Sequence, residues 1–368
     1  MVEAMEIPKG FKKTEVGIIP DDWGVKTLGE VLKIRHGKSQ KEVADANGEY
    51  PILASGGQIG KAKRYLYNKP SVLIGRKGTI DVPQFMDEPF WTVDTLFYSE
   101  ILEDNEPKFL YYRFLLIDWY SYNEASGVPS LNAKTIEQIQ IPLPPTKAEQ
   151  AAIAEALNDA DALITELEKL IAKKQAIKQG AMQELLKPKE GWEVKTIGEI
   201  AIVGRGRVIS HKEISKSIEG KYPVYSSQTF NNGVMGYLDS YDFDGEYLTW
   251  TTDGVYAGKV YHRNGQFNCT NVCGTIKLKK DYAPFVAYLL DTITPDHVSR
   301  NLANPKLMND PMKRIEIPLP NHEEQIHIAQ ILSDMDNEIE ALEKKLDKYK
   351  MLKQGMMQNL LTGKIRLI

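Results

Sequence analysis

The side chains best suited to binding chemistry in this chain are basic residues and amides that gather in loops. Between Lys33 and Lys77 there are ten Lys or Arg and three acids, and Gly254–Lys280 holds five Lys or Arg and no acid. Lys and Arg neutralise DNA phosphates, and arginines and amides hydrogen-bond to base edges in the major groove. The pattern is compatible with contact with double-stranded DNA, although the whole chain carries a net charge of −4. Solvated surface loops are the alternative interpretation of the same charges.

Side chains that carry catalysis or bind metals and nucleotides show no recognisable pattern. His36–Ser39 contains Gly-Lys-Ser but lacks the first glycine of a phosphate-binding loop. The six histidines show no metal-ligand spacing, and the sequence lacks the Asn-Pro-Pro-aromatic tetrad of an adenine methyltransferase. Cys269 and Cys273 are expected to pack in a core. We therefore expect no catalytic residue, no metal site and no cofactor site in this chain.

The composition is that of a globular protein with room for two or three domains. The chain has 368 residues, of which 42% are hydrophobic and 26% charged. No apolar run approaches the eighteen or so residues that span a bilayer, and the first residues lack the apolar region of a secretory signal. Two cysteines are too few for a disulfide framework. We expect a cytoplasmic protein without membrane contact.

The chain repeats itself. "IPLPPTKAEQAAIAEALNDAD" from Ile141 returns as "IPLPNHEEQIHIAQILSDMD" from Ile317. At an offset of 175, about half of the residues paired between 149–186 and 324–361 are identical. Upstream, "WGVKTLGEV" from Trp23 is echoed by "WEVKTIGEI" from Trp192. Each half therefore consists of a module followed by one long helix, and two such halves indicate a pseudo-dimer within one chain.

The repeated segments predict two long helices, 147–186 and 322–361. Thr146 with Glu149, and Asn321 with Glu324, have the spacing of capping boxes. Apolar residues recur at alternating intervals of three and four, which is the pattern of a coiled-coil seam. The predicted seam consists of Ile153, Leu157, Ile164, Leu167, Ile171, Ile328, Leu332, Ile339, Leu342 and Leu346. The matched seams favour helices that pair with each other, and packing of each helix on its own module is the alternative.

The modules are predicted to be irregular and sheet-rich, because short β-type runs are cut by Gly, Pro and Asn. We expect an α+β protein with modules at 1–145 and 188–320 and with helical segments at 146–187 and 321–368. Since helix 147–186 runs into the second module, pseudo-symmetry predicts that the tail "GKIRLI" lies close to the N-terminal segment "FKKTEVGIIPDDW".

Several of these segments together resemble the specificity (S) subunit of type I restriction-modification systems. They are "TEVGIIPDDWGVKTLGEV", the "IPLP…EQxxIAxxL" element in two copies, and "KQGAMQELL". The resemblance covers nearly the whole chain. It implies two target recognition domains, each reading one half of a split DNA site, and an antiparallel helix pair that spaces them. It also implies that chemistry belongs to partners: two methyltransferase (M) subunits that use S-adenosylmethionine, and restriction (R) subunits that use ATP and Mg²⁺.

The resemblance also allows DNA-contacting loops to be assigned by position. The candidates are Arg35, Lys38, Lys41, Lys61, Lys63, Arg64, Arg76, Lys77, Arg205, Arg207, Lys212, Gln228, Asn231, Asn232, Thr251, Thr252, Lys259 and Arg263. Two other interpretations remain open at this point. One is a scaffold or decoy that binds M-type partners without reading DNA, and the other is a self-sufficient DNA-acting enzyme.

Overall fold

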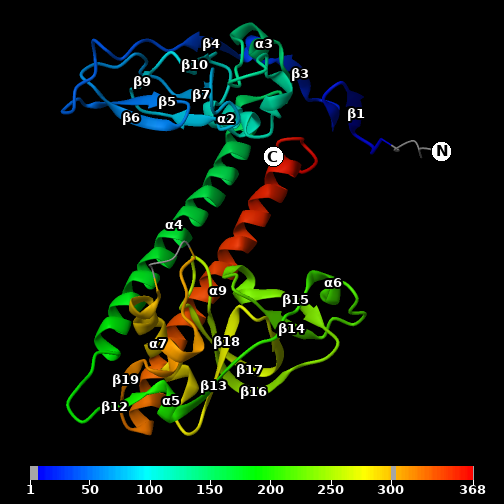
Figure 1. Cartoon of the computed structure of the whole chain (residues 1–368). Helices are drawn as coiled ribbons and strands as arrows, with labels where there is room; N and C mark the ends of the chain where they lie inside the picture. Colours follow the sequence, from blue (N-terminus) through cyan, green and yellow to red (C-terminus); the bar gives the residue numbers. More distant parts are fainter. Residues whose placement is uncertain (1–6, 300–303, 368) are drawn as a thin grey trace. The chain divides into compact units, whose positions relative to one another are not determined.

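The computed structural model describes residues 7–299 and 304–367. The chain divides into two compact units, one formed by 1–169 with 344–368 and the other by 170–343. Each long helix therefore contributes its two parts to different units. The sequence-based boundaries separated helices from modules, whereas each compact unit contains one module and a part of both helices (Figure 1).

Small sheets build the module of the first unit. Two of them are two-stranded, one has three strands and one has four. The pairs are β1 (Phe11–Thr14) with β2 (Gly17–Pro20), and β3 (Gly24–Thr27) with β11 (Gln140–Leu143). The four-stranded sheet has the order β4 (Leu32–His36), β10 (Leu96–Ile101), β7 (Ser71–Gly75) and β8 (Gln84–Met86). The three-stranded sheet has the order β6 (Gly57–Ala62), β5 (Tyr50–Ala54) and β9 (Trp91–Thr92).

Short helices cover these sheets and close the first core. They are α1 (Leu28–Val31), α2 (Pro107–Phe114), the 3₁₀ turn η1 (Trp119–Tyr122) and α3 (Ala133–Gln138). The long helix α4 (Lys147–Leu185) follows β11 directly. The core gathers large apolar side chains of the module, such as Trp23 and Trp119, around the first turns of α4.

The second unit contains one larger, mixed sheet. Its six strands have the order β13 (Ala201–Arg205), β18 (Cys273–Leu278), β16 (Phe243–Thr251), β17 (Val260–Cys269), β14 (Tyr222–Tyr225) and β15 (Val234–Leu238). All pairs are antiparallel except β14 with β17. A separate pair joins β12 (Glu193–Thr196) to β19 (Glu316–Leu319). Cys269 and Cys273 are buried between strands, as the sequence predicted.

The helices of the second unit are α5 (Ile197–Ile200), α6 (His211–Ile214), the 3₁₀ turn η2 (Phe230–Gly233), α7 (Ala283–His297), α8 (Asn309–Lys313) and α9 (His322–Leu360). Helix α7 lies against β16 and β17 and carries the core residues Phe285 and Leu289. Within the described part of the chain, no helix has both the length and the apolarity that crossing a bilayer requires.

The upstream repeat around Trp23 and Trp192 forms the same local structure twice. In each copy a strand leads into a one-turn helix that begins with a complete capping box. The Thr27 and Thr196 amides donate to Glu30 and Glu199, respectively, each at 2.7 Å. The preceding strand pairs with the "IPLP" strand of the same unit. This element therefore joins the start of each module to the start of each long helix.

The capping boxes predicted for the long helices are half correct. The Glu149 amide donates to Thr146 Oγ1 at 3.2 Å, and the Glu324 amide to Asn321 Oδ1 at 3.0 Å. The glutamate side chains do not turn back to the caps. Glu149 is fully buried and accepts a hydrogen bond from the Trp23 indole at 3.3 Å. The glutamate side chain of each box thus bonds to the module or to a neighbouring segment instead of to its own cap.

The predicted seam serves two purposes. Ile153 and Leu157 lie in the first core, and Ile328 and Leu332 in the second, where they pack on their own modules. The same cores also take up apolar residues from the last turns of the other long helix, namely Leu360 and Leu361 in the first and Leu185 and Leu186 in the second. The pairing of the helices that the matched seams favoured is therefore confirmed, and packing of each helix on its own module occurs together with it.

In the middle of the seam, only some of the predicted residues are fully buried. Leu167, Ile171 and Ile339 are buried, whereas Ile164, Leu342 and Leu346 are only half-buried. Ion pairs flank the seam in both units: Lys350 with Glu168 at 2.8 Å in the first, and Lys174 with Glu338 at 2.6 Å in the second. In each unit an early part of one helix lies beside a late part of the other, so the helices pair antiparallel, as expected.

A tyrosine, an aspartate and a lysine meet where module and helices join in each unit. In the first unit the Tyr112 hydroxyl donates to Asp161 at 2.8 Å, and Lys353 of the other helix pairs with the same carboxylate at 2.5 Å. In the second unit Tyr288 donates to Asp336 at 2.6 Å, and the ion-pair partner is Lys178. Burial, followed by the hydrogen bond to aspartate, raises the pKa of both tyrosines, so each hydroxyl keeps its proton.

The C-terminal tail lies against the N-terminal segment of the first unit, which confirms the prediction made from the repeat. Arg366 forms two hydrogen bonds with the Asp22 carboxylate, at 2.9 and 3.0 Å, and also binds Glu149. Gly363 has a φ of +72° and packs so closely on Pro20 that a Cβ would lie 2.5 Å from its ring. A glycine is required there by both the backbone conformation and the space.

These differences in burial predict unequal costs of truncation along the seam. Leu157→Ala and Leu332→Ala each remove a fully buried side chain and should lower the free energy of unfolding by about 2–5 kcal/mol. Leu342→Ala, at a half-buried position, should cost less than about 2 kcal/mol. Urea unfolding of the three variants measures this order. Equal losses at all three positions would contradict it.

Candidate nucleic-acid interface

In the first module, backbone hydrogen bonds bring two of the predicted basic loops together. The Asp45 amide donates to the Lys61 carbonyl, and the Lys63 amide to the Val43 carbonyl, both at 2.9 Å. The loop that carries Lys38 and Lys41 therefore runs beside the end of β6. Lys61 and Lys63 flank the buried Ala62 and are both exposed, because alternate residues of a strand share a face.

Four lysines of this region keep their charge free. Lys38, Lys41, Lys61 and Lys63 are exposed and form no ion pair with any residue that the structure describes. The neighbouring Arg64 lies over the Trp91 ring, with its guanidinium carbon 6.0 Å from the ring centroid. We call the four residues the lysine cluster. It is the part of the first module best suited to contact phosphates.

The other candidates of the first module are tied to carboxylates or stand apart. Arg35 on β4 pairs with Glu100 of β10 at 2.8 Å, and the hydrogen bond to this carboxylate raises the pKa of Arg35. Arg76 follows β7 and donates to the Asp94 carbonyl at 2.6 Å. Lys77 is exposed beside it. Arg35 and Arg76 therefore retain less free charge than the lysine cluster, whereas Lys77 forms no ion pair among the described residues.

In the second module, ion pairs engage most of the basic side chains that were predicted to contact DNA. Arg207 binds both Asp242 (2.8 Å) and Glu213 (2.7 Å), and its hydrogen bond lowers the pKa of Glu213. Arg205 pairs with Asp253 at 3.5 Å. Lys212 on α6 is exposed and forms no ion pair among the described residues. Carboxylates thus neutralise some of the positive charge counted along this part of the sequence, whereas Lys277, Lys279 and Lys280 form no ion pair among the described residues.

Three candidates are not on the surface. Thr251 and Thr252 at the end of β16 are 1% and 0% exposed, and Arg263 on β17 is 4% exposed. The Thr252 hydroxyl donates to the Asp253 carboxylate instead of facing solvent. As placed, these side chains cannot touch DNA, so their assignment as direct contacts is corrected. The sequence did not indicate this because all three are polar residues in or beside β16 and β17, and their burial is decided by what packs on those strands in the fold.

The loop that follows β14 separates its amides into two groups. Gln228 is half-buried, and its side-chain amide donates to the Val234 carbonyl, which closes the loop from inside. Asn231 and Asn232 lie at the tip and are exposed. Phe230 precedes them with 71% of its surface exposed. Charge and amide patterns alone did not single out this ring, and only its exposure in the folded module does.

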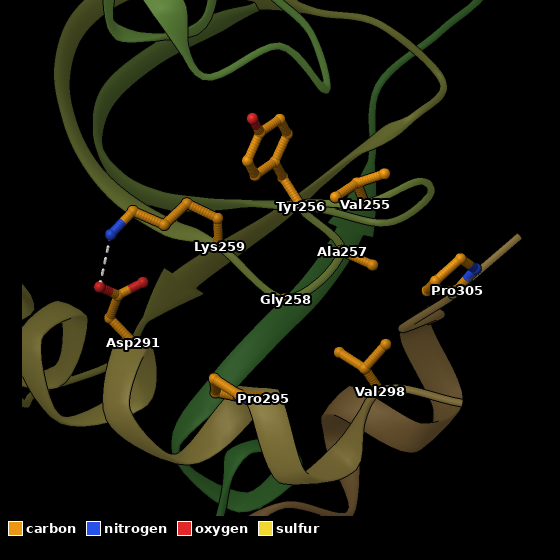
Figure 2. Close-up of a pocket in the computed structure, with 9 residues that line it drawn as sticks. All are labelled: Val255, Tyr256, Ala257, Gly258, Lys259, Asp291, Pro295, Val298 and Pro305. Carbon is orange, nitrogen blue, oxygen red and sulfur yellow. Dashed lines mark hydrogen bonds and ion pairs between the residues drawn. The ribbon is translucent and has the colours of Figure 1, made fainter. Parts of the chain in front are cut away.

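A hollow of about 450 Å³ lies beside Lys259 in the second module (Figure 2). Lys259 pairs with Asp291 of α7 at 2.6 Å, on the wall of this hollow. The adjoining loop presents Val255 and Tyr256, which are 87% and 56% exposed. These exposed apolar side chains were also absent from the sequence-based candidates. Figure 2 shows the lysine and the tyrosine extending from the same short loop.

Across residues 7–299 and 304–367, no group of three or more His, Cys, Asp or Glu side chains is arranged to hold a metal ion. The geometry that is present is that of two sheet-rich modules. Each presents basic or amide-bearing loops, and each is joined to one end of a long, paired helix. The chain is therefore built from two copies of one module-and-helix arrangement.

Comparison with known proteins places the chain in a family. The model of the type I restriction modification DNA specificity domain matches twice, at residues 20–179 and 189–349. The chain therefore belongs to the type I restriction-modification specificity family, as its repeated motifs suggested.

Relatives of this chain are named as type I specificity subunits. A putative type I specificity subunit of Mycoplasma pneumoniae is 33% identical over 62% of this chain and 90% of its own length. The MjaVIII specificity subunit of Methanocaldococcus jannaschii is 27% identical over 100% of this chain and 99% of its own. The crystal structure of an S subunit from M. genitalium shares the fold, with a TM-score of 0.73 at 17% identity, over 97% of this chain and 98% of that one.

The free charges of the lysine cluster lead to a test by salt dependence. The double variant Lys61→Gln, Lys63→Gln should weaken DNA binding when the chain is assembled with its partner subunits. The slope of log K against log salt should become shallower by about 1.8, since each lost phosphate contact removes about 0.9. Lys134→Gln, at an exposed lysine of α3, is the matched control and should leave the slope unchanged. An unaltered slope in the double variant would remove the cluster from the interface.

Proposed function

We propose that this chain is the DNA specificity subunit of a type I restriction-modification complex, in which each module reads one half of a bipartite DNA site. The observation that carries the proposal is the duplication itself: the same junction of strand, one-turn helix and long helix is built twice, with two differing modules. Matched helices suit a partner that docks twice, and divergent modules suit two different half-sites.

The partners follow from the same proposal. Two methyltransferase subunits would dock on the two equivalent helix surfaces, and restriction subunits would join through the complex. S-adenosylmethionine, ATP and Mg²⁺ would then be bound by those partners. A chain from a structure on the complex assembly and conformational transition of a type I R-M system shares this fold with a TM-score of 0.54 at 14% identity, which supports an assembly role.

One observation favours a second candidate. Ion pairs occupy Arg205, Arg207 and Lys259, so the second module offers less free positive charge than its sequence implies. A scaffold that binds methyltransferase subunits without reading DNA would need no such charge. The free lysine cluster of the first module and the exposed amides of the second favour DNA reading instead.

Mapping methylated adenines in host DNA, with this subunit present and absent, tests the function directly. We expect methylation within two short specific blocks separated by a constant stretch, and loss of both blocks when the subunit is removed. Methylation that is unaffected by its removal would support the scaffold. Modification or cleavage of DNA by the purified chain with Mg²⁺ would instead indicate an enzyme.

The role of the helix pair as a spacer leads to a separate test. One heptad inserted after Leu167 and one after Leu342 keep the seam in register and lengthen each helix by about 10.5 Å. The two blocks of the methylated site should keep their sequences while their separation grows by a few base pairs. An unchanged separation would leave the helices as a docking surface only.

A further inference from the structure

The tip of the loop after β14 has an unusual backbone. Asn231, Asn232 and Gly233 are three successive residues in the left-handed region, with φ of 49°, 50° and 81°. Among the described residues, the two asparagines are the only non-glycine residues with positive φ. Asparagine tolerates this conformation better than most residues, but it is adopted only where the surroundings enforce it.

A buried arginine enforces it here. The Arg263 guanidinium donates from Nη2 to the Asn232 carbonyl at 2.8 Å and from Nε to Thr249 Oγ1 at 3.3 Å. It lies between the rings of Tyr225 and Tyr261, with its central carbon 3.7 and 4.5 Å from their centroids. The aromatic faces and the carbonyl stabilise the cation at a site that solvent does not reach.

Arg263 has no acidic partner among the residues of 7–299 and 304–367, and its burial lowers its pKa. Removing a cation from water costs free energy, so an apolar side chain would fill this part of the core at a lower free-energy cost. Its best hydrogen bond reaches the backbone of the loop tip. Gly233 packs on it so closely that a Cβ would lie 3.2 Å from Nη2.

The base of the loop is closed independently. The Ser226 amide donates to the Gly233 carbonyl at 2.9 Å, and the Gln228 side chain donates to the Val234 carbonyl. The tip is thus held from two sides. What it presents to solvent is one aromatic ring, Phe230, and the side-chain amides of Asn231 and Asn232, which form no hydrogen bond with another described residue.

These groups have the chemistry of base recognition. An asparagine amide can donate and accept at once, which matches the N7 and N6 groups of adenine in the major groove. Such recognition gains from a loop backbone that is fixed before binding, because less conformational freedom is then lost on binding. An exposed apolar ring beside it suits the methyl group of a thymine.

Resting on the proposed function, we propose that Phe230, Asn231 and Asn232 read an adenine–thymine pair in the second half-site, and that Arg263 is the positioning residue that holds their loop. Arg263 then acts from below the surface, without touching DNA. This assigns a role to a buried charge that the direct-contact interpretation left unexplained.

Glycine substitutions at the tip test the reading role. Asn231→Gly and Asn232→Gly permit the left-handed backbone and remove the side-chain amide, at the cost of a more flexible backbone at these positions. In the complex with methyltransferase subunits, discrimination at one A·T position of the second half-site should fall by about tenfold or more. The first half-site, read by the other module, should be unchanged and serves as an internal control. Asn264→Ala, at an exposed asparagine that follows Arg263 on the opposite face of β17, should have no effect.

Arginine substitutions test the positioning role. Arg263→Lys keeps the charge but loses the planar fork, and Arg263→Met keeps the bulk alone. Both should relax the same A·T position while the salt dependence of binding stays unchanged, since a buried residue releases no counterion from DNA. A shallower salt slope would mean that Arg263 contacts phosphate and would overturn its assignment.

The outcomes separate the two proposals. If the wild-type complex methylates a split site and the glycine variants methylate it with full discrimination, the loop does not read DNA and the proposed function stands. Relaxation at a G·C position would overturn the adenine assignment. If an arginine variant does not fold, the glycine variants alone decide. A wild-type complex without any split site would remove the proposed function and this inference together.

Discussion

The structure depends on one contact that each long helix cannot make alone. Asp161 near the start of α4 is met by Lys353 near the end of α9, and Asp336 near the start of α9 is met by Lys178 near the end of α4. A module tyrosine binds the same carboxylate in both units. Because each aspartate bonds both a module and the opposite helix, each unit is complete only when both helices are present.

This reciprocity explains why the helices match and the modules differ. The last turns of each helix fill the core around the first turns of the other, so a change in one helix must suit both units. The buried glutamines Gln150 and Gln325 add a matched link between each helix and its own module, since each accepts a hydrogen bond at 2.9 Å from the amide of a residue that caps a module helix. The recognition loops share no such contacts and are free to diverge, which is what two different half-sites require.

Charge in the folded protein is distributed differently from charge along the chain. Some basic side chains are neutralised by carboxylates that are distant in the sequence, such as Asp242 and Asp291. A count of charges along one stretch of sequence leaves these basic side chains unpaired. The four residues of the lysine cluster, by contrast, form no ion pair with any described residue, although Asp45 lies beside Lys61. In the function proposed here, the two modules would use different groups for recognition, lysines in the first and an amide-bearing loop in the second.

The sequence by itself determined the duplication, both long helices to within one residue, the antiparallel pairing implied by the family resemblance, and the contact of the C-terminal tail with the segment around Asp22. These features follow from periodicity and from repeats, which are local. Only the tertiary structure decided that Glu149 leaves its cap for Trp23, that Thr251 and Arg263 are buried, and that Phe230 is exposed. Each of these depends on which distant strand or helix covers a side chain, and residue type does not specify that cover.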